Sequence, residues 1–303
     1  MNRIIMTALL AMVCFFASGK KEVKPQWPDG STISEWFTDT AKIDVKTLGK
    51  QYVITKYGVK NDPSILQTQQ IQAVIDRCER VRYIDCHIES PTFGDYHAPS
   101  SDAIDLDVCD DVVVRGCYMN ICDDAVCLKG GKGTYVDRDS TAGAVNRVLV
   151  EQCRFGNHVN AGVTFGSEAW NCHNVIMRNC QMENAHRLLL FKMRPDTPQQ
   201  YGDVLVENCT GTTRHSAIEA STWTQFYNKQ ERADMPVSGV RNVTVRNIDI
   251  KTANFFKVEM KHPFVLKDFT LDHIQATDKH NCFDSDKVEG MIVSNVTLNG
   301  NKR

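Results

Sequence analysis

The sequence predicts an all-β protein, a right-handed single-stranded parallel β-helix with a short N-terminal cap helix. Two observations predict this fold: one strand-like pattern recurs along the chain, and no long helical periodicity separates its copies. Each copy reads apolar, any residue, apolar, two polar residues, and then a cysteine or an aliphatic residue. The copies end 22 to 39 residues apart, at Cys86, Cys117, Cys153, Cys180, Cys209, Ile248, Ile274 and Val296.

Repeats of this length are typical of solenoids, in which each coil buries its apolar side chains against its neighbours. A βαβ fold needs a crossover helix between parallel strands, and a leucine-rich repeat needs a leucine spacing that is missing here. An asparagine before the last position suits a left-handed turn and a bond to the asparagine of the next coil. These asparagines are Asn179, Asn208, Asn247 and Asn295.

The chain contains 12 cysteines. In an exported protein that number suggests disulfides. Because several of them recur at the same place in the repeat, we interpret them as small core residues stacked between coils, with disulfides as the alternative.

The first residues resemble a targeting segment. Asn2-Arg3 forms a short positive region, residues 4–16 are nearly all apolar, and residues 17–19 are small. The apolar run is too short to span a bilayer stably. We expect a cleaved signal peptide over residues 1–19 and a periplasmic or secreted protein; a retained anchor and a lipoprotein at Cys14 are the alternatives.

The rest of the chain divides into two parts. Residues 20–80 are expected to form an N-terminal cap region, and residues 81–303 the β-helix domain. Within the cap, Ser64 can begin a helix whose apolar residues recur at helical spacing up to about Arg80. An amphipathic helix there would cover the open first coil, as terminal repeats require.

Composition narrows the range of partners. Of the 303 residues, 24% are charged and 42% are hydrophobic, which is ordinary for a protein with a sizeable core. A formal net charge of −2 gives no electrostatic case for nucleic acid or an anionic membrane surface. We expect a monomer with no nucleic-acid partner and no membrane partner.

Three aspartates form the candidate chemical centre. Asp102 and Asp123 are 21 residues apart, about one coil, so Asp102 should lie beside the Asp123-Asp124 pair, about 4.8 Å along the stack. Three clustered carboxylates repel one another and raise at least one pKa, which suits acid and base roles in glycoside hydrolysis.

Strand geometry qualifies this interpretation. Asp123 and Asp124 face the same way only if the backbone bends, because adjacent strand residues point to opposite sides. The alternative is a solvated turn pair, as we expect for Asp110-Asp111. Asp105 and Asp107 alternate with apolar residues and are expected to point outward as structural residues.

A basic strand follows at residues 186–194. Leu189, Phe191 and Met193 should point inward. The outward positions then hold His186, Lys192 and Arg194, of which the last two can clamp a carboxylate. An ordinary solvated strand face is the alternative. Lys129, one strand after Asp124, adds charge to the same surface.

Taken in order, these motifs resemble glycoside hydrolase family 28, the polygalacturonase and rhamnogalacturonan hydrolase family, whose fold is the pectin-lyase-like solenoid. Ser101-Asp102 resembles its Asn-Thr-Asp element, and Asp123-Asp124 its Asp-Asp pair. Residues 160–168 resemble its Gly-His-Gly element with the Gly-Ser-Glu that follows, and residues 190–192 its Arg-Ile-Lys element. The likeness runs from about 81 to 298, and 57–59 and 64–80 match the family's N-terminal cap.

The resemblance implies an inverting glycosidase that degrades a pectic polysaccharide or oligosaccharide, galacturonan or rhamnogalacturonan, without cofactor or metal. Asp123 would be the general acid on the glycosidic oxygen. Asp102 and Asp124 would activate the attacking water, and Lys192 would bind a sugar carboxylate.

The sequence departs from the family pattern at two site positions. Ala161 stands where the family has histidine, and His158 either replaces it or is an ordinary loop histidine. Leu190 stands where the family has arginine, and Arg194 is the candidate replacement. These changes are closer to rhamnogalacturonan-directed or exo-acting members. Trp223, which opens the aromatic stretch 223–227, can form a sugar-stacking wall.

A third departure concerns length. The family places several coils between the cap helix and the Asn-Thr-Asp coil, whereas here residue 80 leads directly into the strand pattern ending at Cys86. About a hundred residues are absent relative to the family, so the prediction includes impaired or altered activity. The alternatives are a polysaccharide lyase, whose acidic cluster would hold Ca²⁺, and a non-catalytic glycan-binding β-helix.

Overall fold

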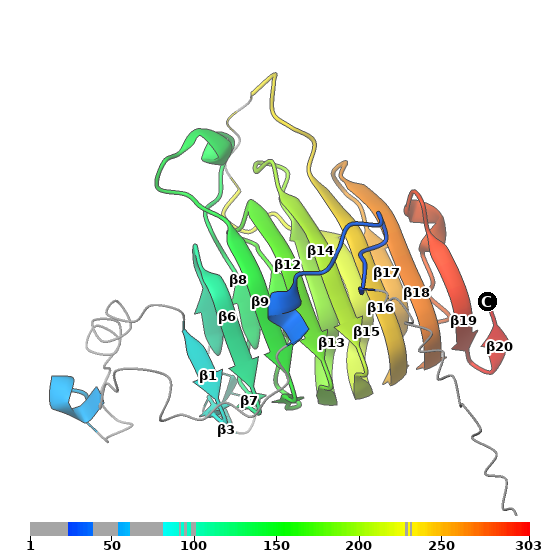
Figure 1. Cartoon of the computed structure of the whole chain (residues 1–303), viewed down its shortest axis with the longest axis horizontal. Helices are drawn as coiled ribbons and strands as arrows, with labels where there is room; N and C mark the ends of the chain where they lie inside the picture. Colours follow the sequence, from blue (N-terminus) through cyan, green and yellow to red (C-terminus); the bar gives the residue numbers. More distant parts are fainter. Residues whose placement is uncertain are drawn as a thin grey trace, which may run out of the picture.

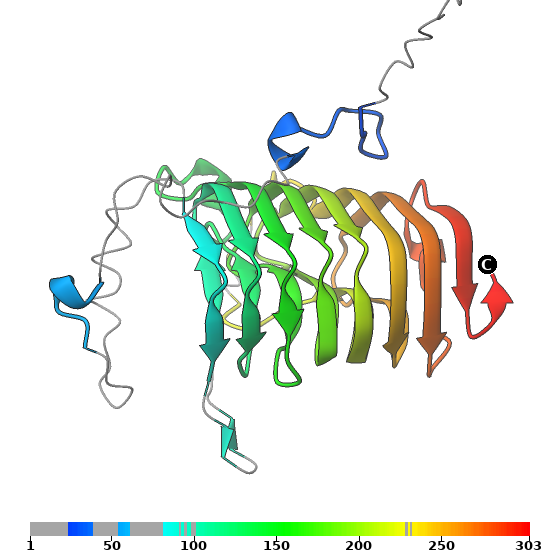
Figure 2. The same ribbon diagram turned by 60° about the horizontal axis from the view of Figure 1, so that its bottom comes forward.

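The computed structural model describes residues 24–38, 54–60, 81–90, 92–93, 96–97, 101–227, 230 and 232–303. These residues form a long parallel β-helix, which confirms the predicted fold (Figures 1 and 2). The predicted signal peptide, residues 1–19, and the predicted cap helix, residues 64–80, lie outside the described residues. None of the helices that the structure describes has the length and apolar character needed to span a bilayer.

The coils stack as three parallel ladders. The first ladder consists of β1 (Arg82–Ile84), β6 (Asp110–Arg115), β9 (Val145–Glu151), β12 (Asn171–Arg178), β14 (Gln200–Glu207), β16 (Gly239–Thr252), β18 (Val265–Asp278) and β19 (Ile292–Leu298). The second ladder begins with β2 (His87–Glu89), β7 (Tyr118–Asn120) and β10 (Arg154–Phe155), and continues through the first parts of β13 (Gln181–Met193) and β15 (Thr210–Thr222) into the ends of β16, β18 and β19. The third ladder consists of β5 (Ile104–Leu106), β8 (Val126–Leu128), β11 (Ala161–Phe165), the second parts of β13 and β15, and β17 (Asn254–Glu259).

The remaining elements are short. They are the hairpin β3 (Thr92–Phe93) and β4 (Tyr96–His97), the terminal β20 (Asn301–Lys302), and the 3-10 turns η1 (Glu35–Thr38), η3 (Ile54–Tyr57), η4 (Val136–Arg138) and η5 (Ser285–Lys287).

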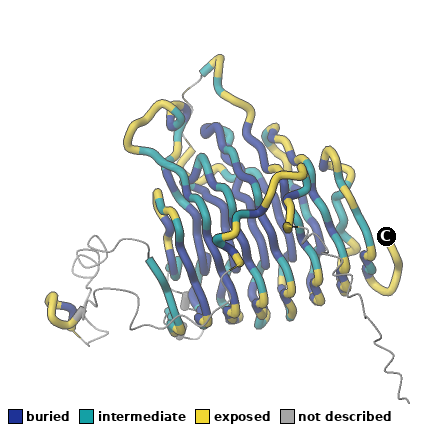
Figure 3. Tube along the Cα trace, viewed as in Figure 1, coloured by how far each residue is buried: buried dark blue, intermediate teal, exposed yellow. Residues whose placement is uncertain are grey.

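The repeat found in the sequence is the stacking register of the second ladder. His87 pairs with Tyr118, and Tyr118 pairs with Arg154, so the cysteines preceding them lie on top of one another. The same register continues along the ladder to Cys180 and Cys209. All ten cysteines in the described part of the chain are free thiols, as the stacked-core interpretation predicts. Figure 3 shows the buried interior running through the coils.

Left-handed residues mark the corners between the first and second ladders. Asn179, Asn208, Asn247 and Asn295 have φ angles between 53° and 55°. Asn208 Nδ2 donates to Asn179 Oδ1 at 3.2 Å, which joins successive coils as predicted. A second left-handed series inside the first-ladder strands was not predicted: Asp111, Arg147, Asn174, Asp203, Asn242 and Asp268.

Residues 24–38 lie across the outside of the first ladder, drawn in dark blue in Figures 1 and 2. Trp27, Ile33 and Phe37 are buried there against an outward-facing apolar row. The row consists of Val113, Leu149, Ile176 and Leu205. Arg178 Nη1 also donates to the Phe37 carbonyl at 2.9 Å. This segment, which we call the strap, therefore covers a side of the solenoid, where the sequence predicted part of an end cap.

Candidate active site

Stacking brings the three predicted aspartates together where the third ladder begins. Asp102 precedes β5, and Asp123 and Asp124 precede β8 in the next coil. Ile104 pairs with Val126, so Asp102 is in register with Asp124 rather than with Asp123. The backbone N–H of Asp124 donates to Asp102 Oδ1 at 3.0 Å. One carboxylate oxygen from each aspartate lies within 4.8 Å of the others.

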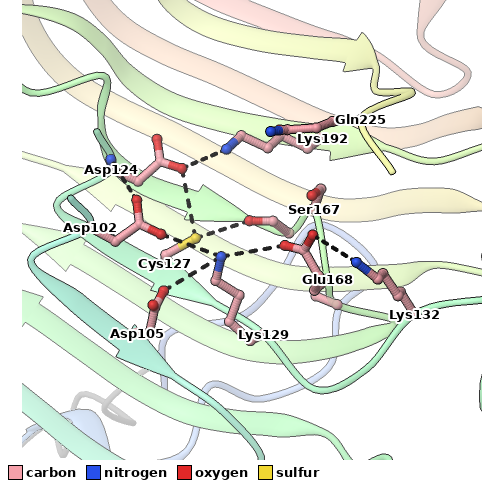
Figure 4. A network of polar contacts seen from close by, with 12 residues as sticks. Asp102, Asp105, Asp124, Cys127, Lys129, Lys132, Ser167, Glu168, Lys192 and Gln225 are labelled. Carbon is pink, nitrogen blue, oxygen red and sulfur yellow. Dashed lines mark hydrogen bonds and ion pairs between the residues drawn. The ribbon is translucent and has the colours of Figure 1, made fainter. Parts of the chain in front are cut away.

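Asp124 is the buried member of the three, with 0% exposure. Lys192 Nζ donates to its Oδ2 at 2.6 Å (Figure 4). Asn160 Nδ2 donates to its Oδ1 at 2.7 Å. Both carboxylate oxygens are therefore bonded inside the protein. Buried carboxylates require such partners, because an uncompensated charge in the interior is costly.

Asp123 faces a cavity and is only partly buried. Burial, followed by the neighbouring charges of Asp124 and Asp102, raises the pKa of Asp123 from 3.8 to about 6. Lys192 acts in the opposite direction without reversing the shift. Asp123 thus remains protonated at a mildly acidic pH where an ordinary aspartate is ionised.

Lys129 joins Asp102 to a wider ion-pair network (Figure 4). Its Nζ lies 3.4 Å from Asp102 Oδ2, 3.5 Å from Asp105 Oδ1 and 3.5 Å from Glu168 Oε2. Burial works to raise the pKa of Glu168, but Lys129 and a hydrogen bond with Ser167 lower it to about 2. Lys129 therefore provides positive charge beside Asp102, in the region where the sequence placed it.

A second polar chain supports Asp124 from the other side. Asn160 Oδ1 accepts a hydrogen bond from Arg187 Nη1 at 2.6 Å, and Arg187 Nε donates to Glu219 Oε2 at 2.8 Å. Burial works to raise the pKa of Glu219, but His215, Arg187 and Ser216 hold it well below its ordinary value. The Asn160 amide is thereby fixed between Asp124 and a charged pair, which sets its orientation.

The cavity beside Asp123 has a volume of about 420 Å³. It is lined by Cys122, Asp123, His158, Asn160, His186, Arg214 and Trp223. The sequence predicts His158, His186 and Trp223 as binding residues, and the structure brings all three to the same cavity. Arg214 joins them from β15.

Lys192 and Arg194 do not form the predicted clamp. Lys192 is buried by Asp124 on one side and by the Trp223 ring, whose centroid lies 4.6 Å from its Nζ, on the other. Arg194 is 1% exposed and forms two bonds to Asp196, at 2.8 and 2.7 Å. Arg194 also donates to the carbonyls of Gln225 and Phe226. Both cations point outward from the coil. Asp124 and Asp196 pair with them, and the backbone of the loop after β15 also bonds Arg194, which the local sequence pattern does not reveal.

Two long loops lie side by side, one between β8 and β9 and one between β15 and β16 (Figure 1). The second loop begins at Trp223, which lines the cavity. Arg232 of the second loop donates to both carboxylate oxygens of Asp137 in the first, at 2.5 and 3.1 Å. Lys132 lies 5.2 Å from the centroid of the Phe226 ring. Phe226 and Tyr227 are 71% and 43% exposed, so the aromatic stretch presents apolar rings to solvent.

The sequence did not single out Asn160, Arg187, Arg214 and Glu219 as site residues. Arg187 lies beside predicted His186, at a position that strict alternation with Leu189 would place on the inner face. In the structure Leu188 and Leu189 are both in the core cluster, so strict alternation does not hold after Arg187, whose guanidinium bonds Asn160 and Glu219. Arg214 and Glu219 lie one coil beyond the quoted motifs, where no spacing rule pointed.

The comparisons with known proteins identify the fold. No protein-family model matches the sequence, and the search of curated proteins finds no relative. Among solved structures, the chain is similar to a hyperthermoactive exopolygalacturonase from Thermotoga maritima, with a TM-score of 0.58 and 17% identity. The match covers 74% of this chain and 50% of that protein, so the chain spans about half its length. At this identity the likeness shows a shared β-helix architecture.

Proposed function

We propose that this protein is a glycoside hydrolase of pectic polysaccharides or oligosaccharides, related to glycoside hydrolase family 28. The observation that carries the proposal is Asp123: it faces a cavity, its pKa is raised to about 6, and two further carboxylates lie beside it. Glycosidases generally use two carboxyl groups, one protonated as the acid and one ionised as the base or nucleophile. The β-helix shared with an exopolygalacturonase supports the pectic substrate class.

In the proposed reaction, Asp123 gives its proton to the glycosidic oxygen as the bond from that oxygen to the anomeric carbon breaks. A water attacks the same carbon, and Asp102 takes a proton from the water. The Asp102 side chain is 18% exposed, whereas Asp124 is fully buried. We therefore assign the base to Asp102 alone. Asp124 acts as a fixed negative charge that helps to keep Asp123 protonated.

Inversion of the anomeric configuration is proposed from the family resemblance. Inverting enzymes usually separate their carboxyl groups by about 6.5–9.5 Å. Here the nearest oxygens of the three aspartates lie within 4.8 Å, so carboxylate spacing does not support inversion. Proton NMR of the first product formed distinguishes the two courses, because an inverting enzyme releases the anomer opposite to that of the substrate.

The N-terminal pattern leads us to propose a periplasmic or secreted location, where pectic fragments would be met. The test of function is incubation of the purified chain with polygalacturonan and rhamnogalacturonan fragments. The expected result is new reducing ends, which are lost in Asp123→Asn. An unsaturated product that absorbs in the ultraviolet would instead indicate a lyase, and absence of turnover on both substrates would leave a non-catalytic glycan-binding β-helix.

A further inference from the structure

We infer that Arg214 is the residue that binds the carboxylate of a uronic acid in the cavity beside Asp123. The inference rests on the proposed function and deepens it, because it assigns the acidic sugar to the cavity and moves its recognition away from Lys192. Four observations lead to it: the position of Arg214, its hydrogen bonds, the lack of an acidic partner for it, and the ion pair that holds Lys192 on Asp124.

The position and bonding of Arg214 leave one end of its guanidinium available. The side chain extends from β15 to the cavity lining. Its Nε donates to the Asn184 carbonyl at 3.0 Å, and its Nη2 donates to the Asn157 carbonyl. Two backbone bonds fix the plane of the group, while Nη1 has no partner among the described residues. A guanidinium held in this way is preorganised to donate to an incoming acceptor.

The charge of Arg214 also lacks compensation. The other arginines around the site are paired with acids: Arg187 with Glu219, Arg194 with Asp196, and Arg232 with Asp137. No carboxylate in the described part of the chain forms an ion pair with Arg214. Burial lowers the pKa of Arg214, with no acid acting against it. Arg214 is an exposed residue whose guanidinium is desolvated only in part, and without a counter-ion it is open to an anionic ligand.

Lys192 cannot bind a substrate carboxylate without breaking its ion pair with Asp124. Its Nζ is 2.6 Å from Asp124 Oδ2, and its side chain is 8% exposed. Pulling it away would leave a fully buried carboxylate unpaired, which is strongly unfavourable. Arg214 is therefore the cation of this cavity that a substrate carboxylate reaches without disrupting the aspartate cluster.

The cavity has the size and lining for an acidic sugar. A volume of about 420 Å³ lies within the range of small-molecule sites. Trp223 offers an aromatic face for the sugar ring, and Arg214 offers the charge for its carboxylate. Because Asp123 lines the same cavity, a uronic acid anchored by Arg214 would be held next to the proton donor.

The test compares Arg214→Gln with unchanged Arg214, both in the Asp123→Asn background, on two probes. The probes are an oligogalacturonide and the same oligosaccharide with its carboxylates reduced to alcohols. Loss of a charge-assisted bond should weaken oligogalacturonide binding about ten- to hundredfold, while the reduced probe should be bound equally by both proteins. Arg214→Lys should recover part of the affinity. Calorimetric titration in the Asp123→Asn background measures binding without turnover.

The control is Arg241→Gln, because Arg241 is an exposed arginine on β16 that bonds Gln200 Oε1 at 3.3 Å, outside the cavity. Thermal melts of each variant check folding. The inference would be overturned if Arg214→Gln lost affinity equally for both probes or for neither. It would also be overturned if the parent protein did not bind the oligogalacturonide. Arg214-dependent binding without hydrolysis in the unchanged protein would support the inference while rejecting the proposed catalysis.

Discussion

Lys192 donates to Asp124 at 2.6 Å although the two residues are 68 positions apart in the sequence, and both side chains are more than nine-tenths buried. The contact spans from β13 to the turn before β8, so it exists only because the coils stack. The contact fixes the negative charge of Asp124 beside Asp123.

Lys192→Met should destabilise the protein by about 3–5 kcal/mol, because it leaves the Asp124 carboxylate buried without its cation. Denaturant unfolding measures the change. Lys132→Met is the matched control: Lys132 pairs with Glu168 at 3.3 Å but is 39% exposed, so its loss should cost less than about 1 kcal/mol. If the two variants unfolded at the same denaturant concentration, the structural role assigned to Lys192 would be wrong.

Activity should fall as the pH rises through about 6. The general acid must be protonated, and Asp123 loses its proton near that value. The measurement is kcat/KM on oligogalacturonide between pH 4 and 8. A profile that stays flat across pH 6 would exclude Asp123 as the group that limits the alkaline side.

The same shift predicts a pH-dependent stability difference. The folded-state pKa of Asp123 lies above its ordinary value of 3.8, so its contribution is fully present below 3.8 and is lost as the pH rises through about 6. Asp123→Asn does not ionise, and should therefore gain stability relative to the unchanged protein between pH 4 and 6. Thermal melts at several pH values would show this, and a pH-independent difference would contradict it.

Asn160→Leu should lower kcat with little change in KM. The substitution removes the bonds from Asn160 Nδ2 to Asp124 Oδ1 at 2.7 Å and from Arg187 Nη1 to Asn160 Oδ1 at 2.6 Å. The Asp124 carboxylate, whose charge keeps Asp123 protonated, is then held less firmly. We expect a fall of about tenfold, together with a shift of the alkaline limb towards lower pH. An unchanged pH profile would mean that Asn160 only supports the fold.

Trp223→Ala should raise KM about two- to tenfold, the range expected for one lost aromatic contact. Trp223 lines the cavity and covers Lys192, with 4.6 Å from Nζ to the ring centroid. Phe226→Ala is the comparison, since Phe226 is 71% exposed and is not part of the cavity lining. Equal effects of the two substitutions would place the sugar on the outer aromatic surface instead.

Phe37→Ala should destabilise the protein by about 3–5 kcal/mol, although Phe37 is far from the site in sequence and lies in a 3-10 turn. Its ring is 2% exposed and packs on the outer apolar row of the first ladder with Trp27 and Ile33. Urea unfolding measures the loss. A change below about 1 kcal/mol would show that the strap adds little to folding.

Much of the solenoid could be predicted because its repeat is local. The position of Cys117 within its pattern already indicates that Cys86 and Cys153 stack on it, since equivalent residues of successive coils lie in register. The spacing of Asp102 and Asp123 similarly indicated that the acids meet. The predicted register was wrong by one residue, because the paired strands place Asp102 opposite Asp124 and not opposite Asp123.

Other features depend on contacts that no local pattern encodes. Arg194 looked like a ligand-binding cation until the structure paired it with Asp196 and with the backbone of the β15–β16 loop. Strict alternation would point Arg187 inward, but Leu188 and Leu189 both enter the core and Arg187 bonds Asn160. The strap could not be predicted, because its docking row is an outward-facing stripe formed by four separate coils.

The sequence by itself determined the coil, the stacked cysteines, the asparagine corners and the meeting of three aspartates, because each follows from a periodicity that one coil imposes on the next. Only the tertiary structure decided which aspartate is buried, which cation neutralises it and which arginine is left facing the cavity. Burial and ion pairing depend on side chains that converge from several coils and loops, and those distances are fixed only when the whole stack has formed.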